Sequence, residues 1–296
     1  MSLGSWTMLC ACGPPWGAVM LCKSWWDAAR RLPVSGMKCL CEPPPVRLTA
    51  STLRHAAQSI SQIAHKNRLL ARLPDAAWQR WHPQLEWVDL QQGQVLHEAG
   101  SSLDHAYFPT TAIVSLLNVT QDGASTEIAA VGNEGVLGVS LFMGGESTCS
   151  RAVVQSAGAG LRLKAQAMRA EFERSNEVLL VLLRYTRALM TQMGQTAVCN
   201  RHHTIDQQLC RCLLLNLDRL GGNQIVMTHE LIAGTLGVRR EGVTETALKL
   251  QTAGLIRYSR GRITVLDRGG LERRACECYA VVRKEYDRLL TDQLAA

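Results

Sequence analysis

Two neighbouring side chains near the carboxyl end, Arg240 and Glu241, have the types and the spacing to recognise DNA bases. An arginine can donate two hydrogen bonds to O6 and N7 of guanine, and a glutamate can accept one from N4 of cytosine, so the pair suits a G·C step. Bases are read in this way when the side chains project from a helix that lies in the major groove. The residues around the pair must therefore form such a helix.

The stretch 227–267 predicts a helix-turn-helix followed by a two-stranded wing. Thr228 suits the N-cap of the first helix, and Gly237 suits the turn because glycine enters the left-handed conformation freely. In the second helix, apolar residues recur at i, i+4 and i+7 and predict one buried stripe, made of Val243, Ala247 and Leu250. The opposite face of this helix carries the Arg-Glu pair and would meet the groove.

The wing is expected as two alternating strands, at 255–258 and 262–266, around a turn at Arg260-Gly261. Six basic residues and only two acidic ones lie in the second helix and the wing, the basic ones being Arg239, Arg240, Lys249, Arg257, Arg260 and Arg262. Positive potential is thus concentrated where the phosphates of a duplex would lie. A membrane surface is the rival partner, but this stretch lacks the exposed apolar face that membrane binding would require.

The segment resembles the C-terminal domain of the Crp/Fnr family of bacterial transcription regulators, through Thr-x-x-x-Ile-Ala-x-x-Leu-Gly at 228–237 and Arg-Arg-Glu-x-Val at 239–243. Two departures from the family pattern predict a different preferred site: Arg239 replaces the usual small polar N-cap, and Glu245 replaces a second base-reading arginine. The resemblance implies that bases are read by Arg239, Arg240, Glu241, Thr244 and Glu245. It also implies that phosphates are held by Thr228, Lys249, Arg257, Arg260 and Arg262.

The length of 296 residues favours two domains, with ample chain for a core. The formal net charge of +7 is uneven: residues 1–50 have five Lys/Arg and two Asp/Glu, residues 51–199 have twelve of each, and residues 200–296 have fifteen and eleven. We expect a disordered or misannotated leader at 1–50, with Met37 as an alternative start, because this segment has no sustained periodicity. The other expected parts are a β-roll with a flanking helix at 51–170, a dimerisation helix at 171–200 and the winged helix-turn-helix domain at 201–296.

Residues 88–164 run in short alternating segments between turn residues, which predicts a β-sandwich or barrel. Strands are expected at 94–97, 106–108, 112–119, 126–131, 151–157 and 161–163, and an amphipathic helix is expected within 52–81, before Pro74. The strand region resembles the cyclic-nucleotide-binding β-roll of the same family. The predicted fold class is therefore α+β: an N-terminal β-roll with a long dimerisation helix, then a C-terminal winged helix-turn-helix domain.

The segment 132–139 stands where the family has its phosphate-binding cassette, in which glycines let backbone amides approach a phosphate. Val139 replaces the glutamate that holds the ribose in binding members, and their Arg-Ser/Thr-Ala sequence is inverted here as Ser150-Arg151-Ala152. A one-residue shift turns a strand side chain to the opposite face, so Arg151 should miss the phosphate. We expect a degenerate effector pocket that does not bind cyclic AMP and whose ligand is unknown, formed by Gly132, Gly135, Gly138, Val139, Ser150 and Arg151.

Residues 171–200 return to a helical pattern in which side chains step by three and four, as in a coiled-coil seam: Leu179, Leu182, Thr186, Leu189, Met193 and Thr196. In the family this helix forms the dimer interface, so we expect dimer contacts from Leu179, Leu182, Leu189 and Met193. The alternative is a helix packed only on its own β-domain. A linking helix is expected at 200–220 and a final helix at 271–290.

The eleven cysteines do not predict a metal site or a disulfide framework. Five lie in the first fifty residues without a Cys-x-x-Cys pair: Cys10, Cys12, Cys22, Cys39 and Cys41. Further candidates recur at i, i+4 in helical segments, as Cys199 with His203 or as His202, Asp206 and Cys210, but simple helix-face histidines and core thiols are the favoured interpretation. A redox or metal-responsive sensor that uses the N-terminal or helix cysteines is the alternative function.

Together these patterns predict a dimeric, sequence-specific transcriptional regulator of the Crp/Fnr type, controlled through the β-roll by an unidentified signal. The expected partners are double-stranded DNA with an imperfect palindrome and a second copy of the chain, with RNA polymerase as an open third partner and no membrane. The sequence has no nucleophile elbow, P-loop or His-Glu-x-x-His, so neither an enzyme nor a catalytic residue is predicted. A bacterial cytoplasm is the expected location.

Overall fold

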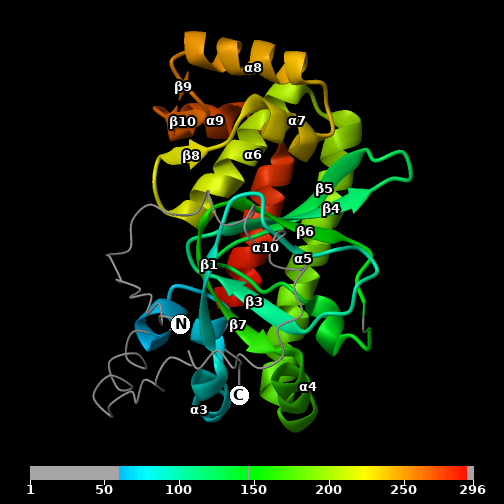
Figure 1. Ribbon diagram of the computed structural model, residues 1–296. Helices are drawn as coiled ribbons and strands as arrows, with labels where there is room; N and C mark the ends of the chain where they lie inside the picture. Colours follow the sequence, from blue (N-terminus) through cyan, green and yellow to red (C-terminus); the bar gives the residue numbers. More distant parts are fainter. Residues whose placement is uncertain (1–59, 146, 292–296) are drawn as a thin grey trace, which may run out of the picture. The chain divides into compact units, whose positions relative to one another are not determined.

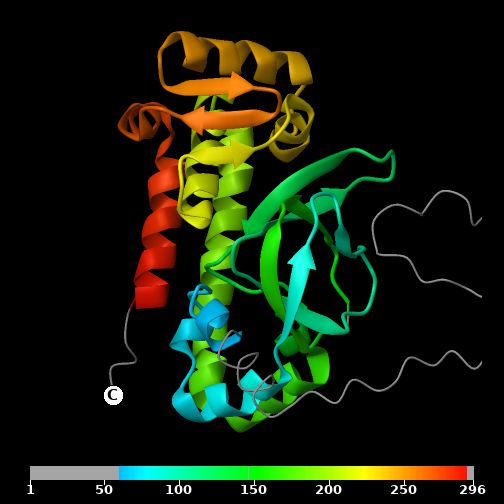
Figure 2. The same cartoon turned by 60° about the vertical axis from the view of Figure 1, so that its left-hand side comes forward.

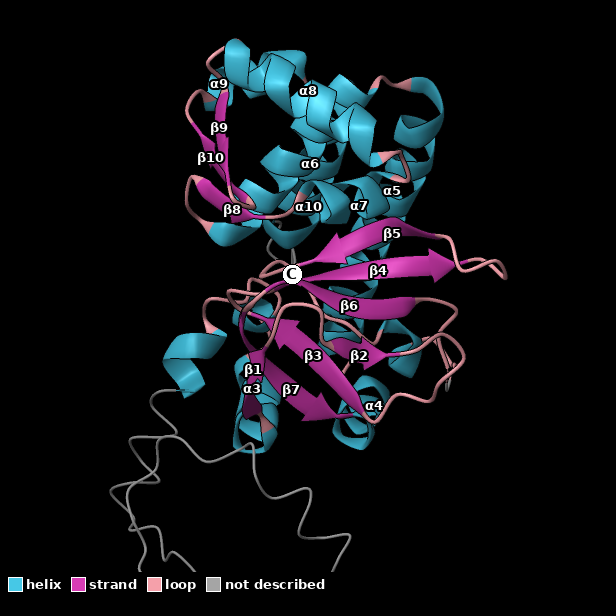
Figure 3. Cartoon of the chain, turned by 45° about the horizontal axis from the view of Figure 1, so that its top comes forward, coloured by secondary structure: helices cyan, strands magenta, loops and turns pink. Residues whose placement is uncertain are grey.

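The computed structural model describes residues 60–145 and 147–291, and the first large element of this part is an antiparallel β-roll (Figures 1 and 3). Its two sheets have the strand orders β1-β7-β3 and β2-β6-β4-β5. The strands are β1 (Glu86–Leu90), β2 (Val95–His97), β3 (His105–Pro109), β4 (Ile113–Val119), β5 (Ser125–Val131), β6 (Arg151–Ser156) and β7 (Gly158–Lys164). Each of the six predicted strands overlaps one of these, whereas β1 was not predicted as a strand of its own.

The core of the roll is made by the inward side chains of both sheets and by the helices that close one end. Phe108 of β3 and Leu161 of β7 are fully buried, as are Val114 and Val154 in the other sheet. Trp81, at the end of α3 (Asp75–Trp81), stacks at a tilt on Phe108 with ring centroids 5.9 Å apart. Burial of such large side chains contributes most of the favourable free energy of folding.

The helix predicted before Pro74 is interrupted, because Asn67 turns the chain. Residues 60–64 are helical, and the chain then turns before the 3-10 helix η2 (Leu70–Arg72). A second 3-10 helix, η3 (His82–Gln84), follows α3. The buried side chain of Asn67 accepts hydrogen bonds from the backbone N–H groups of Leu69 and Leu70 and donates to the carbonyls of Pro109 and Gly135. These bonds satisfy a buried amide and fix the turn against the roll.

The 3-10 helix η4 (Val139–Phe142) lies between β5 and β6, and α4 (Ala165–Arg174) follows the last strand of the roll. Two long helices come next. They are α5 (Asn176–His202) and α6 (Ile205–Leu220), and the predicted linking helix starts later than expected because α5 continues to His202. The chain bends between them at Thr204, whose side chain accepts from the N–H of Gln207 while the Gln207 side chain accepts from the N–H of Thr204. This capping box starts α6.

The predicted coiled-coil seam of α5 packs largely against the chain's own core. Leu182 and Leu189 are buried against the β-roll and the last helix, and Leu179 and Met193 are half-buried. A neighbouring apolar stripe is exposed instead, formed by Leu180, Leu183, Met190 and Val198. The sequence pattern could not distinguish them, because α5 has apolar side chains on both faces.

The C-terminal part is a winged helix-turn-helix domain that contains a third strand (Figure 2). Its elements are β8 (Gln224–Val226), α7 (His229–Leu236), α8 (Arg240–Thr252), β9 (Ile256–Ser259), β10 (Arg262–Val265), α9 (Arg268–Arg274) and α10 (Glu277–Thr291). The unpredicted β8 pairs with β10 and extends the wing to a three-stranded sheet, β8-β10-β9. The predicted final helix is in fact two, because the backbone is extended at Ala275, and α10 packs beside α5 (Figure 1).

Candidate DNA interface and effector pocket

The helix α8 holds the predicted base-reading side chains on its exposed face. Gly237 closes α7 with φ of +66°, and Arg239 occupies the N-cap of α8 in an extended conformation without a side-chain capping bond. Val243, Ala247 and Leu250 are buried, whereas Arg240, Glu241, Thr244 and Glu245 are exposed. The nearest carboxylate oxygen of Glu230 is 4.0 Å from the Arg240 guanidinium, which makes a long ion pair. The Arg240 side chain is two-thirds exposed and can therefore reach a ligand.

A histidine that the sequence analysis did not single out joins α7, α8 and the wing. The His229 ring stacks on Tyr258 of β9 with centroids 4.1 Å apart, and its Nδ1 lies 2.9 Å from Oγ1 of Thr244. Partial burial, with the nearby Arg240 charge, lowers the pKa of His229 and so favours the neutral ring. No spacing rule connects these three residues, because they come from three separate elements.

The wing presents three exposed arginines, Arg257, Arg260 and Arg262. Its turn is tight, with positive φ at both Arg260 (+48°) and Gly261 (+76°). Arginine at positive φ is strained relative to glycine or asparagine, so the turn keeps a charged side chain at its tip against the conformational preference. Lys249 on α8 pairs with Glu245 at 2.7 Å, which partly neutralises two of the predicted contact residues in the free protein.

A mainly apolar cavity of about 230 Å³ lies between the β-roll and α5. Of the six predicted pocket residues, Gly138, Val139 and Ser150 line it, next to side chains that include Leu137, Leu189 and Met193. None of the described residues around it is an arginine or a lysine. Arg151 does not line the cavity and makes an ion pair with Glu98 at 3.1 Å.

The other two glycines of the cassette, Gly132 and Gly135, do not line this cavity and lie against helices instead. A Cβ atom at Gly135 would lie within 2.4 Å of the Tyr185 ring, and one at Gly132 would lie 2.7 Å from the Arg219 side chain. Both positions therefore need glycine to let helices α5 and α6 approach. The glycine-rich pattern was a true signal of close packing, but the neighbour is the protein itself.

Glu134, between these glycines, contacts α6 rather than the cavity. Its Oε1 accepts from Nε of Arg219 on α6 at 2.8 Å, and both side chains are about 6% exposed. Arg219 also donates to the carbonyl of Ala130 and to Oε1 of Gln192 on α5. Burial opposes the Arg219 charge, but Glu134 more than offsets it, so the pKa of Arg219 is raised and the cation persists at any physiological pH.

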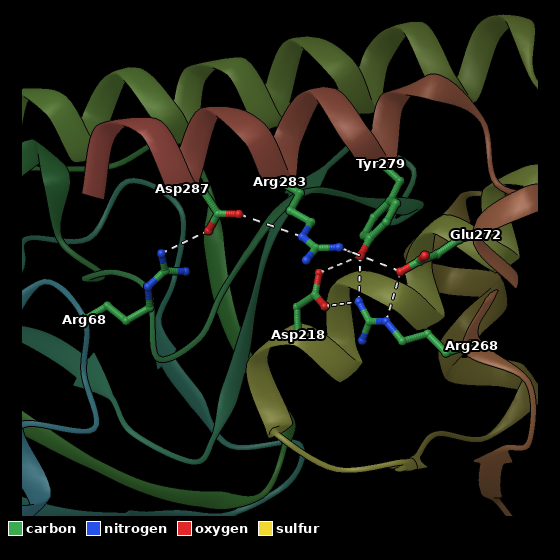
Figure 4. Close-up of polar contacts among 7 residues, drawn as sticks. All are labelled: Arg68, Asp218, Arg268, Glu272, Tyr279, Arg283 and Asp287. Carbon is green, nitrogen blue, oxygen red and sulfur yellow. Dashed lines mark hydrogen bonds and ion pairs between the residues drawn. The ribbon is translucent and has the colours of Figure 1, made fainter. Parts of the chain in front are cut away.

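A second, more exposed polar network runs along α10 (Figure 4). Tyr279 donates from its hydroxyl to Asp218 of α6 at 3.0 Å and accepts from Arg268 of α9 at 2.7 Å. The network continues through ion pairs to the segment before η2 and consists of Arg68, Asp218, Arg268, Glu272, Tyr279, Arg283 and Asp287. Together with Arg219, it fastens the helix-turn-helix domain to α5 and the roll.

Both parts of the chain match known protein families. Residues 87–175 match the model of the cyclic nucleotide-binding domain, and residues 207–274 match that of the Crp-like helix-turn-helix domain. No curated protein sequence matches the chain. In the part that the structure describes, no helix is long and apolar enough to cross a membrane.

Three solved structures illustrate the similarity in fold. FixK2 from Bradyrhizobium japonicum is 16% identical with a TM-score of 0.55, covering 65% of this chain and 98% of FixK2. A Crp/Fnr-family transcriptional regulator from Thermus thermophilus is 22% identical with a TM-score of 0.52, covering 64% of this chain and 98% of that regulator. The c-di-GMP-responsive regulator CLP from Xanthomonas campestris is 14% identical with a TM-score of 0.53, and the match covers 66% of this chain and 100% of CLP.

Proposed function

We propose, from the premise that the chain belongs to the Crp/Fnr family of transcriptional regulators, that it is a homodimeric regulator that reads an imperfect DNA palindrome through α8. The observation that carries the proposal is the exposed Arg240-Glu241 pair on a helix whose other face is buried, next to a basic wing. Because the target is chromosomal, the site of action is the cytoplasm of a bacterium. RNA polymerase is the further partner that such a regulator would meet.

In this proposal, the side chains divide into base readers and phosphate contacts. Arg240 and Glu241 read a G·C step, and Thr244 adds a contact whose position His229 fixes. Arg239 and Glu245 flank these readers on the same helix. The phosphates are held by Thr228, Lys249, Arg257, Arg260 and Arg262, all of them exposed. Lys249 must exchange Glu245 for a phosphate on binding.

The dimer contact is assigned to the exposed stripe of α5 rather than to the predicted seam. Leu183 and Met190 are seven residues apart and are 43% and 64% exposed, and Leu180 and Val198 extend the stripe. Gly194 lies on the same side with open space above it, which permits close approach of a second helix. Two copies related by a two-fold axis would place two α8 helices about one DNA turn apart, roughly 34 Å.

The effector is proposed to be a small, mostly apolar molecule rather than cyclic AMP. The cavity of about 230 Å³ lies below the roughly 300–1,000 Å³ of typical ligand pockets. A cyclic phosphate buried there would have no lysine or arginine among the described lining residues, and an unpaired buried charge costs several kcal/mol. Thermal shifts measured with cyclic AMP and c-di-GMP test this, and stabilisation of the wild-type chain by cyclic AMP would refute it.

The experiment that tests the DNA-binding proposal separates base readers from phosphate contacts. At fixed salt, Arg240→Ala should relax the sequence preference, whereas Arg260→Ala should weaken binding to every duplex alike and lower the salt slope by about one. Arg273→Ala, an exposed arginine of α9, is the control for net charge. If the Arg240 and Arg260 variants lose specific and non-specific binding in the same ratio, the division is wrong.

The alternative function is a redox or metal-responsive regulator, and part of it concerns cysteines outside the described residues, Cys10 to Cys41. The helix cysteines are favoured as the responsive group by their position at the α5–α6 junction. Absorbance and metal content of the anaerobically purified chain distinguish this alternative from control by a cavity ligand.

A further inference from the structure

Three cysteines and a histidine from two distant parts of the chain meet at the junction of α5, α6 and α10. Cys199 lies in the last turn of α5 and His203 is its C-cap, while Cys276 and Cys278 flank the start of α10. The four ligand atoms, three Sγ and one imidazole nitrogen, all lie within 4.8 Å of one another. The three thiols are buried, and the His203 side chain is 13% exposed. The alternative ligands His202, Asp206 and Cys210 do not belong to this group of four.

The spacing of these atoms fits a tetrahedral metal centre. With Zn–S bonds of about 2.3 Å and Zn–N bonds of about 2.05 Å, tetrahedral angles place two sulfurs about 3.8 Å apart and a sulfur and a nitrogen about 3.6 Å apart. Sγ of Cys199 is 3.5 Å from Sγ of Cys276, and Sγ of Cys278 is 3.6 Å from Nδ1 of His203. We propose that Cys199, His203, Cys276 and Cys278 form a zinc site that clamps the DNA-binding domain to α5.

The surroundings of the four residues are those of a metal site. The other ring nitrogen of His203, Nε2, lies 3.4 Å from a carboxylate oxygen of Glu277, and this is the usual orienting partner of a metal-bound histidine. Gln208 donates to the carbonyls of Cys199 and His203 and so holds the backbone that carries two of the ligands. The ligand set is soft and complete at four groups, which selects Zn²⁺ in a closed structural site.

The charges also balance. Binding of Zn²⁺ to three thiols and a neutral imidazole releases three protons and leaves a centre of net charge −1. Arg211 on α6 is buried, donates hydrogen bonds to Oγ1 of Thr196, and forms no ion pair in the described part of the chain. Burial raises the pKa of Cys199 to about 12, and the Arg211 charge opposes part of that rise. The Arg211 charge therefore acts on the Cys199 thiol and can compensate the negative charge of a zinc–thiolate centre.

The site would have a mechanical role at the junction between the two domains. Cys199 and His203 belong to the end of α5, whereas Cys276 and Cys278 follow α9. Cys276 lies 77 residues after Cys199, and Cys278 lies 75 residues after His203. A metal bound to all four therefore fixes the bend between α5 and α6 and the angle at which α8 is presented. This role is independent of what α8 binds.

The test uses the full-length chain, reduced and stripped of metal, with Co²⁺ and then Zn²⁺ as probes. We expect one equivalent of Co²⁺ to give the d–d bands of a tetrahedral site and a thiolate charge-transfer band, and one equivalent of Zn²⁺ to abolish both. This measurement on the wild-type chain requires no variant to fold. Absence of a tetrahedral cobalt spectrum would overturn the proposal.

Variants locate the metal. Cys276→Ser and Cys278→Ser should each remove the cobalt spectrum. Cys212→Ser should keep it, because Cys212 is a buried cysteine of α6 that lies outside the cluster. A variant with serine at all five N-terminal cysteines should also keep one equivalent of metal. Glu277→Gln should weaken Zn²⁺ binding roughly 10- to 100-fold without loss of the spectrum at saturation. A spectrum that survives Cys276→Ser but disappears with the N-terminal replacements would contradict the proposed ligands.

Discussion

Replacement of Glu134 by glutamine tests whether the buried ion pair joins the two domains. The substitution keeps the shape of the side chain and one hydrogen-bond acceptor but leaves the Arg219 guanidinium without its carboxylate in a place where water cannot replace it. Removing one partner of a buried pair typically costs about 3–5 kcal/mol, because the remaining charge is uncompensated. Glu127 still attracts Arg219, so the lower end, about 3 kcal/mol, is expected.

A loss of about 3 kcal/mol corresponds to a fall in Tm of roughly 6–12 °C, at about 2–4 °C per kcal/mol for a chain of this order of size. Differential scanning calorimetry at pH 7 measures it. Glu86→Gln is the matched control, because Glu86 and Arg162 are as close, at 2.6 Å, but are 46% and 38% exposed. Exposed pairs contribute less than about 1 kcal/mol, so this variant should fall by no more than about 4 °C. Equal shifts for the two variants, or none for Glu134→Gln, would refute the assignment.

Three further predictions concern a titrating carboxyl, the dimer stripe and the histidine beside α8. Burial raises the pKa of Glu127 to about 7, although Ser115 and the Arg219 and Arg211 charges oppose the rise. The folded state therefore binds the proton more tightly than the unfolded state, and the free energy of unfolding falls as pH rises from about 4.5 to 7. Glu127→Gln should therefore match the wild-type Tm near pH 4 and exceed it above pH 7, and a constant difference across that range would disprove the shift. Met190→Asp should make the chain monomeric in sedimentation equilibrium, whereas Asn200→Asp, exposed on another side of α5, should leave a dimer; a dimeric Met190→Asp chain would exclude the stripe. His229→Phe keeps a ring on Tyr258 but loses the contact with Thr244, so discrimination between duplexes should fall about fivefold, equivalent to about 1 kcal/mol; unchanged discrimination would exclude a positioning role.

The parts of the fold that local chemistry determines could be predicted from the sequence. Gly237 ends α7, and the stripe of Val243, Ala247 and Leu250 is buried. Each of these features depends on a few neighbouring residues and on one conformational preference. The same holds for the alternation that gave six of the seven strands of the roll.

Features that depend on distant residues could not be predicted. The break at Asn67 requires carbonyls of Pro109 and Gly135, and the role of Glu134 requires Arg219, 85 residues later. The seam of α5 was assigned to a partner copy because its neighbours in the same chain, such as Tyr286 of α10, lie about a hundred residues away. Cys199 and His203 were visible as a pair, but only folding brings Cys276 and Cys278 to them.

The most direct test of the DNA-binding account is selection of bound duplexes from a random pool by the full-length dimer, with and without candidate effectors. The account predicts one inverted repeat whose half-site centres lie about 10 base pairs apart, with a G·C pair in each half-site whose selection is lost in Arg240→Ala. A pool that stays random under every condition, bound by a monomeric chain, would contradict it.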